Sequence, residues 1–71
     1  MGVETFEDWF LIYRERGYRR QYFCFWVDGN KSSWSMQREQ ACRCQTVKQA
    51  IHVITELKRR NALRRKRVSP N

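Results

Sequence analysis

Three cysteines and one histidine are the residues of this chain best suited to metal or covalent chemistry. Zinc binds four thiolate or imidazole groups tetrahedrally. The candidate zinc ligands are Cys24, Cys42, Cys44 and His52. Their spacing matches no zinc motif that we can name. This favours the alternative in which Cys24 is a small apolar core residue and the other two cysteines lie in a half-exposed strand or loop.

Other catalytic groups are sparse. A nucleophile and base pair of Cys44 and His52 would need a pocket built by a very short chain. The seven acidic residues are scattered, and no glycine-rich run could hold phosphates. A chain of 71 residues holds one small domain. We therefore expect no enzyme and no cofactor.

Positive charge is concentrated after residue 57. Residues 1–57 carry eight basic and seven acidic side chains, whereas residues 58–71 carry seven basic side chains and no acid. Blocks of like charge attract polyanions, so the expected partner is nucleic acid, DNA rather than RNA, or an acidic protein surface. A helix end that only confers solubility is the alternative. The expected phosphate contacts are Lys58, Arg59, Arg60, Arg64, Arg65, Lys66 and Arg67.

The cysteine content and the apolar pattern indicate the compartment. An odd number of cysteines, two of them separated by a single residue, is atypical of a disulfide framework and typical of a reducing environment. No stretch approaches the roughly eighteen apolar residues that a membrane span requires. We expect a cytoplasmic protein without a membrane partner, associated with the nucleoid in a bacterium. In a eukaryotic or viral setting the basic run would act as a nuclear import signal.

The basic run, residues 58–67, is predicted to begin on a C-terminal helix. Thr46 and Gln49 have the spacing of a capping box, which predicts a helix beginning at Thr46 and running to about Leu63. Its predicted buried stripe consists of Val47, Ala50, Ile51, Ile54 and Leu57. Residues 1–63 then form one domain, and residues 64–71 a flexible basic tail.

A β-hairpin is predicted before that helix. Residues 21–27 are β-prone, residues 28–30 favour a turn, and residues 31–36 alternate between polar and apolar. Alternation places Trp34 and Met36 inside the fold. On the first strand, the side chains predicted to pack on the helix are Phe23, Phe25 and Val27.

The opposite face of this hairpin is the second candidate for contact with nucleic acid. Tyr22 and Trp26 are predicted to lie there beside Arg20, where aromatic rings could stack on bases and the guanidinium could bind phosphate. The full predicted set on this face is Arg20, Tyr22, Trp26, Lys31, Ser33 and Ser35.

The N-terminal segment fits two descriptions. Thr5 as a cap and Gly17 as a stop favour a short helix, with apolar residues at helical spacing between them. The competing interpretation makes residues 9–13 a buried strand that turns at Arg16-Gly17. With the helix, a third strand would come from residues 41–45. The predicted class is therefore α+β: an antiparallel sheet of two to three strands on a C-terminal helix, with a short N-terminal helix and a disordered basic tail.

If residues 10–13 form a strand, the order of elements can be compared with known domains. The elements would be that strand, a turn at Gly17, strands over residues 22–27 and 33–36, and a helix opening at Thr46. This order, over residues 10–60, resembles the arm-type or AP2-like N-terminal domains of tyrosine recombinases, which place a three-stranded sheet in the DNA major groove. The chain departs from those proteins in having no recombinase catalytic domain. The DNA-facing positions that the resemblance implies are Arg20, Tyr22, Lys31, Ser33 and Ser35.

Two functions of different classes follow. The first is nucleic-acid binding by the basic run and the hairpin face. The second is a small protein-interaction module, such as an inhibitor or adaptor of mobile-element origin, that acts through an exposed aromatic and arginine face and forms a homodimer. Salt-dependent binding of DNA would favour the first, whereas a dimer that dissociates when the aromatic face is altered would favour the second.

Overall fold

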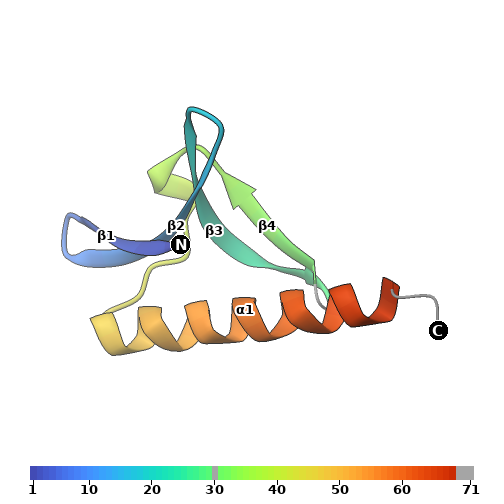
Figure 1. Cartoon of the computed structure of the whole chain (residues 1–71). Helices are drawn as coiled ribbons and strands as arrows, with labels where there is room; N and C mark the ends of the chain where they lie inside the picture. Colours follow the sequence, from blue (N-terminus) through green and yellow to red (C-terminus); the bar gives the residue numbers. More distant parts are fainter. Residues whose placement is uncertain (30, 69–71) are drawn as a thin grey trace.

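A computed structural model describes the backbone of residues 1–29 and 31–68, and the side chains of residues 1–29 and 31–63. A four-stranded antiparallel sheet has one long helix lying across one face (Figure 1). The sheet contains β1 (Gly2–Phe6), β2 (Trp9–Arg16), β3 (Arg19–Asp28) and β4 (Lys31–Ser35), in that order. The 3-10 helix η1 (Arg38–Gln40) and the helix α1 (Val47–Val68) follow. The predicted α+β class is confirmed, but the sheet has four strands rather than two or three.

The predicted N-terminal helix is wrong, whereas the competing interpretation, a buried strand over residues 9–13 that turns at Arg16-Gly17, is confirmed. Residues 2–16 form β1 and β2, which pair antiparallel through a tight turn in which Glu7 has a φ of 55°. Gly17, with a φ of 65°, lies in the turn between β2 and β3 instead of ending a helix. Leu11 and Ile12 are both fully buried although neighbouring strand residues face opposite sides. The sheet is thus covered on both faces, which explains the continuous apolar run.

The linker between η1 and α1, residues 41–46, contacts the backbone of two strands. β2 pairs with β3 over residues 13–16 and 19–22. Beyond this pairing, the amide of Cys42 donates to the carbonyl of Phe23 at 2.8 Å, and Cys44 exchanges hydrogen bonds of 2.9 and 3.0 Å with Phe10. The strand predicted over residues 41–45 is therefore only an isolated bridge at Cys44.

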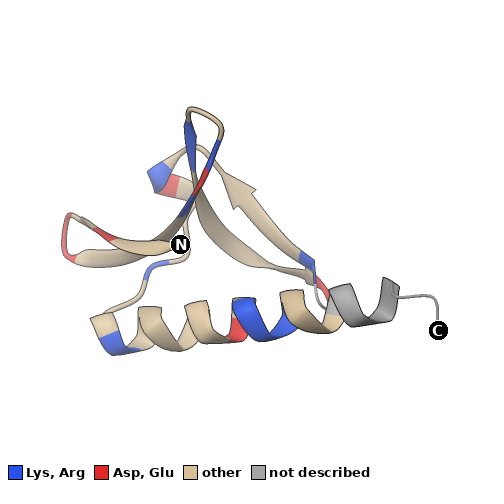
Figure 2. Cartoon of the chain, viewed as in Figure 1, with Lys and Arg blue, Asp and Glu red and all other residues tan. Residues whose placement is uncertain are grey.

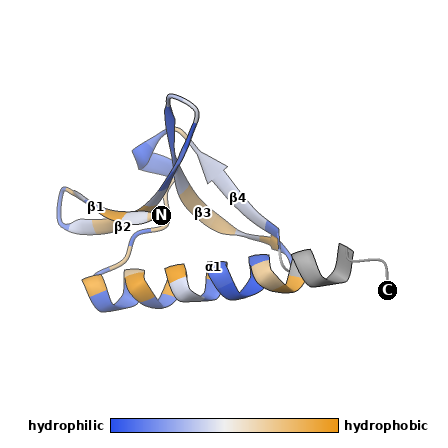
Figure 3. Cartoon of the chain, viewed as in Figure 1, coloured by the Kyte–Doolittle hydropathy of each residue, from blue (hydrophilic) through white to orange (hydrophobic). Residues whose placement is uncertain are grey.

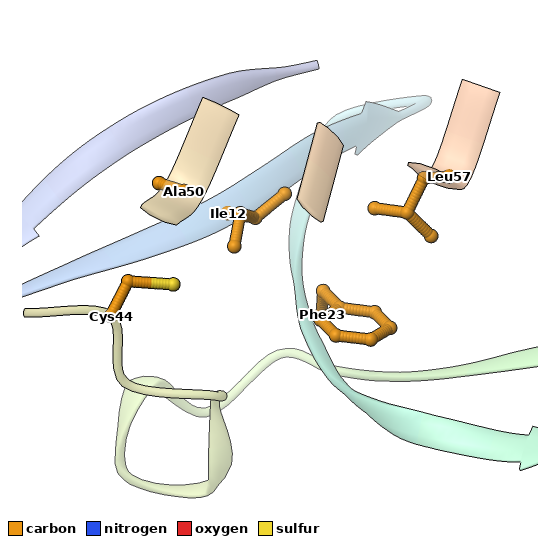
Figure 4. Close-up of a cluster of buried hydrophobic side chains, with 5 residues drawn as sticks. All are labelled: Ile12, Phe23, Cys44, Ala50 and Leu57. Carbon is orange, nitrogen blue, oxygen red and sulfur yellow. The ribbon is translucent and has the colours of Figure 1, made fainter. Parts of the chain in front are cut away.

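Two hydrophobic clusters cover the two faces. On the helix side, Ile12 and Phe23 of the sheet pack with Cys44 of the linker and with Ala50 and Leu57 of α1 (Figure 4). On the other side, which we call the outer face, Leu11 and Tyr22 pack with Ala41 of the linker. The linker residues therefore contribute to both clusters. Apolar residues occupy the strand centres and the first turns of α1, whereas the β2–β3 tip is hydrophilic (Figure 3).

The predicted start of the helix is confirmed. The hydroxyl of Thr46 accepts a hydrogen bond of 3.1 Å from the Gln49 amide, as expected of a cap. The side chain of Gln49 reaches back to the amide of Gln45, at 2.7 Å, one residue earlier than in a standard capping box. The backbone of α1 continues past the predicted end at Leu63 to Val68. This range includes part of the predicted tail, of which residues 69–71 lie outside the described residues.

The buried stripe of α1 differs from the predicted one. Ala50 and Leu57 are buried as expected, and Ile54 is half-buried. Val47 and Ile51 are instead exposed, with Ile51 at 53% of its full surface. Val53, which the predicted stripe omits, packs against the core. The helix is thus rotated about its axis relative to the predicted orientation, because the sheet side chains, rather than the apolar pattern alone, decide which flank is covered.

The predicted hairpin is confirmed as β3 and β4, but its predicted faces are only partly correct. Register shifts between Phe23 and Phe25, and again between Trp26 and Asp28, interrupt the alternation on which the prediction depended. Trp26 consequently packs against the cluster on the helix side, where Phe23 and Trp34 lie as predicted. Phe25 and Val27, predicted to pack on the helix, are each 59% exposed. Met36, predicted to point inward, is exposed as well.

Candidate nucleic-acid interface

The C-terminal part of α1 carries the basic run beyond the sheet. The helix passes the tip that joins β3 and β4 and continues past it (Figure 1). Lys58 is exposed and takes part in no salt bridge within the described residues. The side chains of Arg64, Arg65, Lys66 and Arg67 lie outside the described residues, although their backbone belongs to α1. Four of the seven predicted phosphate contacts are thus carried on the last helical turns.

Arg60 anchors the helix at the point where it leaves the sheet. Its guanidinium donates to the Gly29 carbonyl at 2.6 Å and to Glu56 at 2.8 Å. It also lies 3.9 Å from the centre of the Trp26 ring. Only 26% of the side chain is exposed. Arg60 was predicted as a phosphate contact, but two of its three guanidinium nitrogens donate within the protein.

Glu56 accepts hydrogen bonds from both Arg59 and Arg60. Arg59 donates to it at 2.5 and 3.1 Å and remains largely exposed. Hydrogen bonds from Arg59 and then Arg60 lower the pKa of Glu56 to about 2. Glu56 is therefore ionised at neutral pH and balances one of the two charges. The net positive charge of α1 begins at Lys58 and increases toward its C-terminal end.

Three aromatic rings pack together on the helix side, and an arginine lies over the ring at each end of this row. Phe23 meets Trp26 and Trp34 edge to face, with ring centres 5.3 and 5.8 Å apart. Arg60 covers Trp26, and Arg14 lies 4.1 Å from the centre of Trp34. Both tryptophans thus pack within the protein, and the prediction that Trp26 lies on an open sheet face is wrong.

On the outer face, the carboxylate of Glu4 is a shared hydrogen-bond acceptor for three polar side chains. Tyr22 donates its hydroxyl to Glu4 at 3.0 Å, Arg20 donates at 2.9 Å, and Arg38 of η1 also hydrogen-bonds to this carboxylate. Burial alone would raise the pKa of Glu4, but the hydrogen bonds from Arg38, Arg20 and Tyr22 lower it. Tyr22 is almost fully buried, so it is not exposed on an open face as predicted. Arg20 keeps part of its surface exposed and also pairs with Glu15 at 3.5 Å.

The remaining predicted contacts on the hairpin have different surroundings. Lys31 is exposed and faces Asp28 across the β3–β4 pair. Ser33 is half-buried opposite Phe25. Ser35 donates to the side chain of Gln40 at 2.8 Å and so helps to hold η1. The predicted set on the hairpin face therefore does not form one continuous binding surface.

The four candidate zinc ligands are not assembled into a site. No cluster of three or more His, Cys, Asp or Glu side chains that could hold a metal exists among the residues described. Burial raises the pKa of the Cys44 thiol to about 11, in keeping with its place in the hydrophobic cluster. Burial also raises the pKa of Cys24, whereas His52 is exposed on α1.

The tip between β2 and β3 is a cationic surface that the sequence analysis missed. Arg16, Tyr18 and Arg19 are all exposed there, and Tyr18 is fully exposed. Figure 2 shows arginines on this hairpin, far from those of α1. The signal in the sequence was Arg-Gly-Tyr-Arg between two β-prone runs. The predicted binding set omitted these three residues, although one of the two descriptions of the N-terminal segment placed a turn at Arg16-Gly17.

Comparisons of the chain with protein-family models, curated proteins and solved structures give no match. The resemblance to recombinase domains therefore stays a prediction. Within residues 1–29 and 31–68, no helix combines the length and the apolar character needed to cross a membrane.

Proposed function

We propose that this protein binds duplex DNA through the basic C-terminal part of α1. The observation that carries the proposal is that α1 continues past the β3–β4 tip to Val68, while residues 58–67 contain seven basic residues and no acid. A helix of about 10–12 Å diameter fits the major groove of B-DNA, which is about 12 Å wide. The deep and narrow major groove of duplex RNA admits no such element, which favours DNA.

Anchoring at Arg60 supports this function. The contacts of Arg60 with Trp26, Glu56 and Gly29 fix the helix where it leaves the sheet. The cationic turns that follow are then presented on a supported helix, and less conformational entropy is lost on binding than for a loose tail. In this proposal the sheet serves mainly as the platform for α1, and the phosphate contacts come from Lys58, Arg59 and residues 64–67.

The proposal is tested by salt-dependent binding to a labelled DNA duplex, measured by fluorescence anisotropy. The test variant changes Arg64, Arg65, Lys66 and Arg67 to Gln, and the control is Lys48→Gln at the opposite end of α1. Removal of each phosphate contact should reduce the slope of log K against log salt by about 0.9, or about 3.6 for all four. An unchanged slope in the fourfold variant would exclude this part of α1 as the DNA-binding element.

The second candidate function is contact with a second copy of this chain through the outer face of β3. Phe25 and Val27 are large, apolar and each 59% exposed, and Phe25 lies opposite the uncharged Ser33. Two copies that each carry a net charge of +8 repel one another, so an uncharged apolar patch is the surface on which they can approach most closely. A homodimer built in this way leaves α1, on the other side of the sheet, available for DNA.

A further inference from the structure

The β2–β3 tip presents one aromatic ring between two cations. Arg16 and Arg19 form the last pair of the hairpin, and Gly17 and Tyr18 make the two-residue loop between them. Gly17 has a φ of 65°, as required of glycine at the first central position of a type II′ turn. Tyr18 is fully exposed, and Arg16 and Arg19 are exposed beside it. The turn therefore fixes the backbone, and nothing in the described part of the chain covers the tyrosine ring.

The charges of the tip are not balanced within the fold. Among the described residues, the salt bridges involve Arg20, Arg38, Arg59 and Arg60, but neither Arg16 nor Arg19. The one side-chain hydrogen bond of Arg19 within residues 1–29 and 31–63 is a weak contact of 3.8 Å with the sulfur of Met36. Like charges directly opposite one another destabilise a strand pair, so this pair costs stability that no salt bridge among the described residues offsets.

An exposed tyrosine flanked by arginines has the chemistry of a site for single-stranded nucleic acid. Aromatic rings stack on unpaired bases, and arginine binds the phosphates on either side. A membrane would offer less, because the loop has no apolar surface beside Tyr18 to insert between lipids. We propose that residues 16–19 form a second nucleic-acid site, in which Tyr18 stacks on an unpaired base while Arg16 and Arg19 contact the adjoining phosphates.

This site extends the proposed function and rests on it, but it is physically separate from α1. The tip projects from the sheet on the side opposite to the helix (Figure 1). Changes at the tip can therefore be made without touching the basic run. The two sites bind different forms of DNA. The basic C-terminal part of α1 binds the duplex, and the tip binds unpaired strands such as those at a melted or frayed region.

The experiment compares a labelled oligothymidine with a DNA duplex of the same length. Tyr18→Ala should weaken binding of the single strand about 5- to 150-fold, which corresponds to the removal of one stacked base. The duplex affinity should stay unchanged. Tyr18→Phe is the matched control, because the ring that stacks is retained. The double variant Arg16→Gln/Arg19→Gln should reduce the salt slope on the single strand by about 1.4. Thermal unfolding followed by circular dichroism verifies that each variant is folded.

The possible outcomes separate this inference from the proposed function. Single-strand affinity of Tyr18→Ala equal to that of the unaltered protein, or an equal decrease on both DNA forms, would overturn the inference. The inference would also fail if vesicles containing phosphatidylserine bound in a Tyr18-dependent manner while oligothymidine did not. Conversely, Tyr18-dependent binding of the single strand together with an unchanged duplex salt slope in the fourfold α1 variant would support the tip and refute the helix.

Discussion

The guanidinium of Arg60 lies 3.9 Å from the centre of the Trp26 ring and joins α1 to the far end of β3. The same guanidinium donates to the carbonyl of Gly29 in the β3–β4 turn. One side chain thus connects the helix to a strand and to a turn located more than thirty positions earlier in the sequence. The side chain predicted as a phosphate contact is instead part of the support for the basic helix.

The contact between Arg60 and Trp26 should contribute measurably to stability. In a double-mutant cycle with Trp26→Leu and Arg60→Gln, we expect a coupling free energy of about 0.5–2 kcal/mol, as for a partly desolvated cation–π pair. Urea unfolding of the four proteins measures it. Arg59→Gln with Trp26→Leu is the control cycle, because Arg59 pairs with Glu56 but not with Trp26. Additive effects of Trp26→Leu and Arg60→Gln would show that the stacked geometry contributes nothing.

Because α1 is rotated relative to its predicted orientation, shortening two aliphatic side chains of the helix should lower the free energy of unfolding by different amounts. Leu57→Ala should lower the free energy of unfolding by about 2–5 kcal/mol, because Leu57 is 2% exposed in the core. Ile51→Ala should change it by no more than about 0.5 kcal/mol, because Ile51 lies on the surface. Denaturant unfolding of both variants provides the comparison. A larger decrease for Ile51→Ala would restore the stripe predicted from the sequence.

Acid should lower the stability of the protein through Glu56. Hydrogen bonds from Arg59 and Arg60 depress the pKa of this carboxyl in the folded state from 4.5 to about 2. The stabilisation that it gives is complete above the unfolded pKa and is lost as pH falls from about 4.5 to about 2. Urea unfolding between these pH values should show a shallower pH dependence for Glu56→Gln than for the unaltered protein. Glu39→Gln, at an exposed position in η1, is the control, and identical profiles for all three proteins would contradict the role of Glu56.

If the exposed apolar residues Phe25 and Val27 on the outer face hold two copies of the chain together, altering them should change the oligomeric state. Phe25→Ser should move the molar mass, measured by light scattering over a dilution series, from dimer to monomer. Because Phe25 is largely exposed, the stability of the monomer should change by no more than about 0.5 kcal/mol. Ile51→Ser, at an equally apolar and exposed position on α1, should leave the dimer intact. A monomeric mass of the unaltered protein at every concentration would eliminate this candidate function.

Short-range patterns in the sequence located several elements correctly. The hydroxyl of Thr46 and the side chain of Gln49 determine where α1 begins, because both bonds form within one helical turn. Likewise, the β-prone run, the turn and the alternating run predicted β3 and β4. The concentration of cations after residue 57 is a property of the sequence alone.

Contacts between distant segments decided which faces of the strands are buried and which charged side chains are paired. Leu11 and Ile12 belong to a strand rather than a helix because the linker covers one face of the sheet and α1 the other, whereas the local signals were compatible with both descriptions. The register shifts in β3 exchanged the faces of Phe25 and Trp26, since a single additional residue reverses the alternation. Glu4 became the partner of Arg20 and Arg38 only once β1, β3 and η1 met. The residues of a chain determine which charges and rings exist, but whether each one faces solvent or another side chain depends on contacts between distant segments.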